Sequence, residues 1–223
     1  MTVTIRIIQK QRSCRYCYSM LWTLSSETLF TTISPPSSDF LFSMSMKELL
    51  ECKHPTAWIE FEKGLINEME LARKFFKDGR SFDLEGLKSC MRKGYSYIEG
   101  VEELLQALKK NGYEMHAFTN YPIWYKMIED KLKLSYYLSW TFCSCIMGKR
   151  KPDLDIYLDV LKHLKVEPAN CVFVDDRMRN VEAAINASFI GLQFKNVDLL
   201  HKDLSRLGIH FETNELDFAD IAQ

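Results

Sequence analysis

The segment Cys171–Arg177 constrains the fold of this chain more than any other. Four apolar residues run directly into Asp175 and Asp176, and an amphipathic helix is expected over 177–187. A continuous apolar run is typical of a strand buried in a parallel sheet, and α/β sheets bind ligands at the carboxyl ends of such strands. Two adjacent carboxylates repel each other unless a cation lies beside them, so the pair indicates a divalent metal site. The alternative is one aspartate that caps the helix and one that is solvated.

The chain around this segment alternates between strand and helix patterns. Strands are expected over 114–118, 141–146, 171–174 and 191–194, and helices over 99–111, 123–133, 154–164, 177–187 and 197–207. This alternation predicts an α/β fold with a doubly wound, parallel, Rossmann-like sheet. Residues 45–97 carry apolar residues at helical spacing only, which predicts a helical cap inserted near the N-terminus. The predicted organisation is an atypical N-terminal segment (1–44), the cap (45–97), the core (98–210) and a C-terminal tail (211–223).

Composition narrows the class of protein and its partners. With 223 residues and 47% hydrophobic content, the chain suffices for one α/β domain and a smaller accessory unit. A net charge of -1 argues against nucleic acid or an anionic membrane as partner. Seven dispersed cysteines favour a reducing, intracellular compartment. No acidic residue precedes Glu27, and the basic, hydroxyl-rich segment before it is the composition of an organelle transit peptide or of a solubilising tail. We therefore expect a location in the chloroplast or the cytoplasm.

Polar side chains follow two more of the predicted strands. Thr119 and Asn120 follow the strand at 114–118, where they favour a turn as readily as a site. Lys151 closes a run of three cations that would ordinarily be a solvated loop. Pro152 stiffens the segment and Asp153 is expected to cap the next helix, so Lys151 should have a defined position. A hydroxyl, an ammonium and a carboxylate pair at one sheet edge are what a phosphoryl group with a divalent metal needs.

These residues resemble a known family. Thr119-Asn120, then Lys151-Pro152-Asp153, then Asp175-Asp176-x-x-x-Asn180 are similar in order and spacing to the second, third and fourth motifs of the haloacid dehalogenase-like (HAD) hydrolases. Within that family the cap and the segment 118–124 resemble the plant plastid flavin mononucleotide (FMN) hydrolases.

The resemblance implies a Mg²⁺-dependent phosphomonoesterase that acts on a small phosphorylated metabolite such as FMN through an aspartyl-phosphate. By this match Thr119 and Lys151 are catalytic residues that hold the phosphate, and Asn120 contributes to substrate binding. Asp176 contacts the metal and Asp175 supports it. The oligomeric state stays open.

The first motif of the family is missing. It should be a strand that ends in D-x-D-x-T before about residue 45, and its first aspartate is the nucleophile. The only acids before Ser45 are Glu27 and Asp39, and neither follows a buried strand. The chain as written thus has the groups that hold phosphate and metal but no attacking group. Two interpretations stay open: a phosphatase with impaired turnover, and a non-catalytic phosphate-binding or regulatory isoform.

The genetic code offers an origin for this loss. When codons that encode Ser13–Thr23 are read in the frame that starts one base earlier, they can encode K-L-P-V-L-L-F-D-V-M-D. This sequence has the pattern of a buried strand that ends in aspartate. We therefore interpret residues of about 13–42 as a frameshifted or mis-spliced form of the missing motif. The lost strand belongs between those that end at Thr119 and Asp175, where an empty slot leaves backbone groups unpaired. We predict that Thr2–Ile8 or Cys17–Leu24 fills it and that the remainder is poorly ordered.

The aromatic and histidine side chains have simpler explanations than ligand binding. An aromatic lid for an isoalloxazine ring could be built from Trp58, Phe61, Phe75, Tyr95, Tyr97 and Trp124. Core packing is the favoured role for most of them. His116 lies in the middle of a predicted strand and is expected to be a core histidine with satisfied hydrogen bonds.

Overall fold

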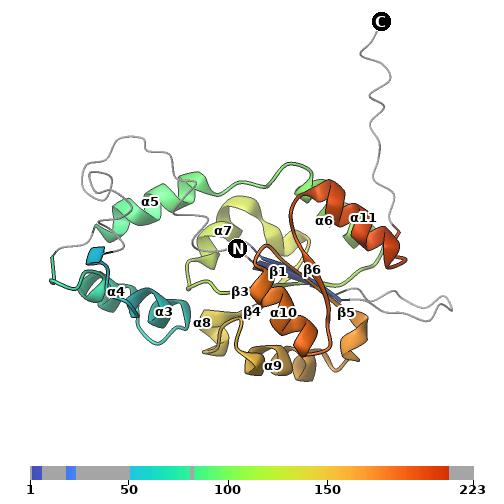
Figure 1. Cartoon of the computed structure of the whole chain (residues 1–223). Coiled ribbons are helices and arrows are strands. Elements are labelled where there is room, and N and C mark those ends of the chain that lie inside the picture. Colours follow the sequence, from blue (N-terminus) through green and yellow to red (C-terminus); the bar gives the residue numbers. More distant parts are fainter. Residues whose placement is uncertain (1, 7–18, 24–50, 81–82, 211–223) are drawn as a thin grey trace, which may run out of the picture.

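The computed structural model describes residues 2–6, 19–23, 51–80 and 83–210 (Figure 1). The strands are β1 (Thr2–Arg6), β2 (Ser19–Thr23), β3 (Met115–Thr119), β4 (Ser139–Cys143), β5 (Cys171–Asp175) and β6 (Ile190–Gln193). The helices are α3 (Ala57–Glu62), α4 (Glu68–Lys74), α5 (Leu84–Gly94), α6 (Val101–Lys110), α7 (Tyr125–Leu132), α8 (Ser144–Met147), α9 (Leu154–Leu164), α10 (Met178–Asn186) and α11 (Val197–Arg206). What the sequence predicts for 7–18, 24–50 and 211–223, including poor order, lies outside the described residues.

The strands form one sheet in the order β4-β3-β1-β2-β5-β6, with an additional pairing between β3 and β2. β2 runs parallel to β3 and β5, β3 runs parallel to β4, and β5 runs parallel to β6. β1 is antiparallel to both β2 and β3. The predicted α/β fold with a doubly wound, Rossmann-like sheet is confirmed, with one antiparallel strand added to it.

Both N-terminal segments enter the centre of the sheet, where only one of them was predicted to do so. Met20 of β2 pairs with Met115 of β3, and Ser19 pairs with Cys171 of β5. Both predicted segments contribute, because Thr4 of β1 also pairs with His116. β1 and β2 therefore both lie between the two strands that end in Thr119 and Asp175. β2 pairs in parallel with both of these strands, which is the place expected for the family's nucleophile strand.

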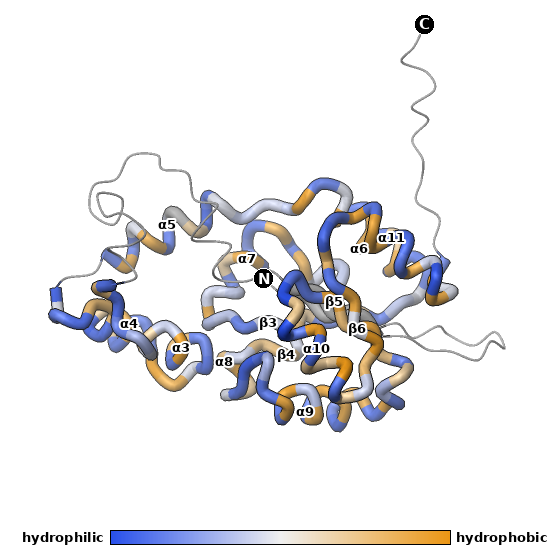
Figure 2. Tube along the Cα trace, in the orientation of Figure 1, coloured by the Kyte–Doolittle hydropathy of each residue, from blue (hydrophilic) through white to orange (hydrophobic). Residues whose placement is uncertain are grey.

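Helices cover both faces of the sheet. Along β5, Cys171 and Phe173 pack with the helices α9 and α10, whereas Val172 and Val174 belong to the cluster that contains α6 and α11. This alternation follows from the two-residue period of a strand. Figure 2 shows polar and apolar residues interleaved along these four helices, as helices with one buried and one solvated side require.

The cap consists of the helices α3, α4 and α5, which lie to one side of the sheet (Figure 1). Asn67 starts α4 with a capping box, in which its side chain accepts from the backbone N–H of Glu70 and the Glu70 carboxylate accepts from the N–H of Asn67. A single antiparallel bridge joins Lys53 to Phe76. The helical composition predicted for 45–97 agrees with the described part of that range, apart from this bridge.

One predicted strand is wrong in its extent. The apolar run 141–146 suggests a strand to its end, but β4 stops at Cys143 and Ser144–Met147 form the short helix α8. Gly148 closes that turn with a left-handed backbone (φ 68°). A short apolar run does not distinguish strand from buried helix, and here the parallel register already begins at Ser139. Among the described residues, no helix is long and apolar enough to cross a bilayer.

Candidate functional site

Lys151 is the centre of the candidate site. Its side chain is fully buried, and its ammonium donates to the backbone carbonyl of Phe118 at 2.7 Å and to a carboxylate oxygen of Asp175 at 3.1 Å. It thereby joins the ends of β3 and β5, the two strands that flank β2. Burial lowers the pKa of Lys151 from 10.5 to about 8, against the opposing effect of the Asp175 charge. Two of the three ammonium donors are engaged by these contacts, which leaves one for an incoming oxygen.

The backbone of Lys151 is held by Asn120. The Asn120 amide donates to the carbonyl of Lys151 at 2.8 Å, and the N–H of Lys151 donates to the Asn120 amide oxygen at 2.8 Å. Asn120, expected to bind substrate, thus positions the lysine. Asp153 does not make the expected cap, because its side chain accepts no hydrogen bond from the first turn of α9. The defined position of Lys151 therefore comes from β3 and its end.

Asp175 is buried and completely engaged. One carboxylate oxygen accepts from the N–H of Arg177 at 2.8 Å, and the other accepts from the Asn180 amide at 2.9 Å and from Lys151. The backbone carbonyl of Asn180 accepts in turn from the hydroxyl of Tyr157 at 2.9 Å. These contacts fit a supporting role for Asp175, since both of its oxygens already have donors.

Asp176 is the accessible member of the pair. It is half-buried, and its backbone carbonyl accepts from Gln193 at 3.1 Å. The amide oxygen of the buried Asn180 has no hydrogen-bond donor among the described residues. Among the described residues, no three His, Cys, Asp or Glu side chains form a group that could hold a metal ion by themselves. The donors fit a Mg²⁺ ion that takes one carboxylate here and further oxygens from a bound phosphate, which is a common way for proteins to hold this ion.

The three consecutive cations of the 149–151 run have three different carboxylate partners. Lys149 pairs with Asp159 at 2.5 Å on the surface, Lys151 pairs with Asp175 in the interior, and Arg150 pairs with Glu62 of the cap at 3.1 Å. A solvated loop is therefore the wrong interpretation of this run. Glu62 was not predicted from the sequence, where the only signal for it is a charged residue directly after Phe61 in a helical pattern.

Thr119 is the last residue of β3 and is fully buried. It lies at the same sheet edge as Asp175, the last residue of β5. β2 enters between these strands and ends at Thr23, and the sequence of β2 is Ser-Met-Leu-Trp-Thr. The strand in the nucleophile's place thus contains no carboxylate.

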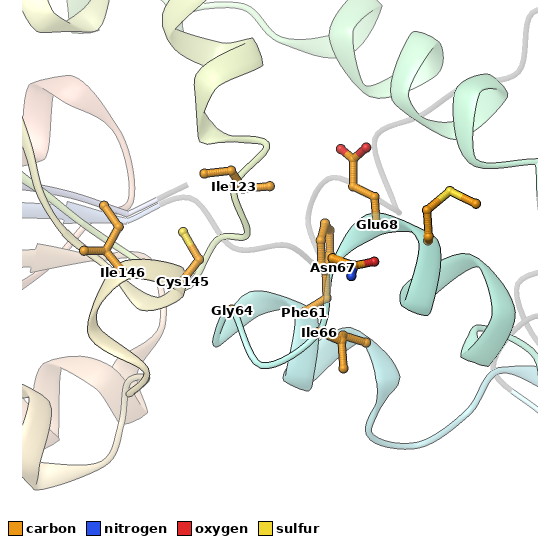
Figure 3. Close-up of a pocket in the computed structure, with 9 residues that line it drawn as sticks. Phe61, Gly64, Ile66, Asn67, Glu68, Ile123, Cys145 and Ile146 are labelled. Carbon is orange, nitrogen blue, oxygen red and sulfur yellow. The ribbon is translucent and has the colours of Figure 1, made fainter.

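A cavity of about 560 Å³ lies between the cap and the core (Figure 3). Ile123, Cys145 and Ile146 line it from the core, in segments that follow β3 and β4. The remaining lining residues come from the cap: Phe61, Gly64, Ile66, Asn67, Glu68 and Met69. The cavity is mostly apolar, and its volume is in the range of pockets for drug-sized ligands.

The favoured interpretations of the aromatic residues and of His116 agree with the structure. Trp58, Phe61 and Trp124 pack edge to face on one another, with ring centroids 5.0 to 6.0 Å apart. Of the six aromatic residues considered for a lid, Phe61 alone lines this cavity. His116 is buried, and its ring nitrogens contact Thr141 at 2.8 Å and Glu114 at 2.9 Å.

Comparison with known proteins gives matches of sequence and of structure. Residues 58–188 match the family model of haloacid dehalogenase-like hydrolases. The chain is 66% identical over 175 residues to the chloroplastic flavin mononucleotide hydrolase 1 of Arabidopsis thaliana, a match that covers 78% of this chain and 71% of that protein.

Two solved structures share the fold. One, described as a predicted HAD-like family hydrolase from Porphyromonas gingivalis, has a TM-score of 0.58 at 19% identity and covers 83% of this chain and 89% of its own. The other is an aspartate-to-alanine mutant of a HAD family enzyme from Bacteroides thetaiotaomicron in complex with magnesium and inorganic phosphate. Its TM-score is 0.55 at 17% identity, with 78% of this chain and 88% of its own covered.

Proposed function

Because the chain belongs to the haloacid dehalogenase-like hydrolases, and within them with the phosphatases, we propose that its site binds a small phosphate monoester together with Mg²⁺ and, as written, turns it over poorly. The leading substrate is FMN, by similarity to the Arabidopsis hydrolase. The observation that carries the proposal is the contrast between an assembled Lys151–Asp175–Asn180 cluster and a β2 strand without a carboxylate.

The residues present account for binding. In the proposed complex the ammonium of Lys151 and the hydroxyl of Thr119 hold the phosphate oxygens, and Asp176 holds the metal with Asp175 in support. A bound Mg²⁺ supplies positive charge that screens the phosphate. The apolar cavity takes the organic part of the ester. The Bacteroides protein supports this division of roles, since the same fold holds magnesium and phosphate after an aspartate has been replaced.

Turnover needs an attacking carboxylate, and β2, the described strand in the nucleophile's place, contains none. Transfer of the phosphoryl group to the protein requires a carboxylate oxygen in line with the leaving oxygen, and positioning without a nucleophile leaves the ester intact. The origin we propose is a one-base shift across residues of about 13–42. Sequencing of the transcript and the genomic DNA across the first fifty codons tests this origin. A single-base change that restores a strand ending in aspartate supports it, and an unbroken frame in both contradicts it.

The binding proposal is tested by calorimetric titration of the purified chain with FMN and with riboflavin, each with Mg²⁺ and with EDTA. We expect FMN to bind more tightly than riboflavin, and Mg²⁺ to strengthen the binding of FMN only. Equal affinities for the two flavins, or an FMN affinity that Asp176→Asn leaves unchanged, would contradict the assignment of the phosphate and metal groups.

We also place the protein in the chloroplast. The named location of the Arabidopsis relative supports this placement. Fusion of the whole chain to a fluorescent protein tests it. Import into plastids is the expected result, and a diffuse cytoplasmic signal would contradict it.

A further inference from the structure

Glu62 is a buried, charged residue of the cap that contacts the core. This residue ends α3 and is 1% exposed. Its carboxylate accepts from the indole N–H of Trp58 at 2.7 Å and pairs with the guanidinium of Arg150 at 3.1 Å. A buried carboxylate is costly unless a cation and hydrogen-bond donors compensate for its lost hydration. The pairing with Arg150 therefore compensates this buried charge where the cap meets the core.

Arg150 transmits this restraint to the candidate site. It directly precedes Lys151, whose backbone N–H and carbonyl are both fixed by Asn120. The Lys151 ammonium also lies over the rings of Phe118 and Phe173, 5.0 and 5.5 Å from their centroids. Since the interior is close-packed, a shift of the backbone at 150–151 moves the ammonium away from its partners.

The cap has further contacts with the core that do not involve charge. The hydroxyl of Ser144 donates to the backbone carbonyl of Glu62 at 2.5 Å. Gly64 approaches the carbonyl of Cys145 so closely that a Cβ there would lie 2.4 Å from the oxygen. Loss of the charge on Glu62 thus leaves the cap with other anchors, so its effect on the site is separable from undocking.

We infer that Glu62 is a positioning residue for Lys151, acting through Arg150, so that the cap sets the place of the phosphate-holding lysine. This inference depends on the proposed function in one respect only, namely that Lys151 holds the phosphate. The geometry itself, a cap carboxylate that restrains the loop 148–153, is independent of which ester binds.

The test is amide hydrogen exchange of the full chain, read by mass spectrometry, with Glu62→Gln beside the control Glu60→Gln. Glu60 lies on the same helix and is also ion-paired, but its partner Lys74 belongs to the cap. We expect Glu62→Gln to speed exchange within 148–153 roughly tenfold, within the usual range of coupling between sites. Glu60→Gln should leave that segment unchanged. Faster exchange confined to 57–62, or none, overturns the inference.

A double variant distinguishes an effect of Glu62 that passes through Arg150 from a general loss of stability. If Glu62 acts through Arg150, the double variant Glu62→Gln/Arg150→Gln should exchange in 148–153 at the rate of the Arg150→Gln single variant. Effects that multiply overturn the inference. Titration with inorganic phosphate then connects the result to function: weaker binding in Glu62→Gln than in Glu60→Gln supports the positioning role. Absence of phosphate binding in the unmodified chain contradicts the proposed function and leaves the exchange result as the test of the coupling.

Discussion

Replacement of Asp175 by asparagine isolates the buried charge pair at the centre of the site. Asp175→Asn keeps the shape of the side chain but leaves the fully buried ammonium of Lys151 without its counter-charge. Removal of one partner of a buried ion pair costs about 3–5 kcal/mol in the free energy of unfolding. We expect a loss of this size at pH 7, measured by urea denaturation in the presence of EDTA.

The loss should depend on pH in a defined direction. In the native chain the pKa of Lys151 is lowered from 10.5 to about 8, so the unfolded chain binds the extra proton between these values and stability rises with pH across that window. Asp175 opposes this shift, so its removal lowers the pKa further and extends the window below pH 8. Each pH unit over which Lys151 is protonated only in the unfolded chain raises the free energy of unfolding by about 1.4 kcal/mol. Between pH 7 and pH 8 only the variant gains stability in this way. Its loss of stability relative to the native chain should therefore be smaller by about that amount at pH 9 than at pH 7.

The control is Asp159→Asn. Asp159 also pairs with a lysine near the same loop, but the two side chains of that pair are 40% and 42% exposed. We expect a small effect on the melting temperature, with no dependence on pH between 7 and 9. The reasoning is refuted if Asp175→Asn loses less than about 1 kcal/mol at pH 7, or if its deficit is the same at both pH values.

Three further predictions concern the cap and the loop at 148–153. Gly64→Ala should lower the melting temperature more than Gly79→Ala, because both have positive φ but an added Cβ meets a carbonyl only at Gly64; equal losses would contradict the close approach. Burial raises the pKa of Cys145 to about 11, so the rate of its alkylation should be low at pH 8 and should increase about tenfold per pH unit up to pH 10. Because Cys145 lines the cavity, bound FMN should lower this rate. Asn120→Ala removes both hydrogen bonds to the backbone of Lys151 and should lower the free energy of unfolding by about 1–3 kcal/mol in urea denaturation. An unchanged free energy of unfolding would mean that these two hydrogen bonds do not stabilise the loop.

The core of the fold was predictable because its signals are local and repeated. The apolar runs that end at Thr119 and Asp175 are strands with two buried faces, and amphipathic segments follow them. The place of the missing strand was also predictable, since an empty central slot leaves two rows of backbone groups without partners. The end of β4 at Cys143 was not predictable, because the apolar pattern continues through the short helix that follows.

The partners within the site were beyond the sequence pattern. The run 149–151 gives no sign that its three cations have different partners, since Glu62 comes from the cap, Asp159 from the next helix and Asp175 from another strand. Likewise, the fixed position of Lys151 was expected from Pro152 and from a cap by Asp153, but Asn120 provides it from the end of another strand. Such contacts depend on tertiary packing, which a pattern of residue types does not contain.

We propose that Lys151 and Thr119 hold the phosphate in this chain but that β2 supplies no carboxylate to attack it. A single-turnover assay tests this directly, with the purified chain in excess over FMN in the presence of Mg²⁺ and with riboflavin and phosphate both quantified. FMN should bind and remain intact. Formation of both products at a rate that Asp176→Asn abolishes would contradict this proposal, because the chain would then supply a nucleophile from outside β2.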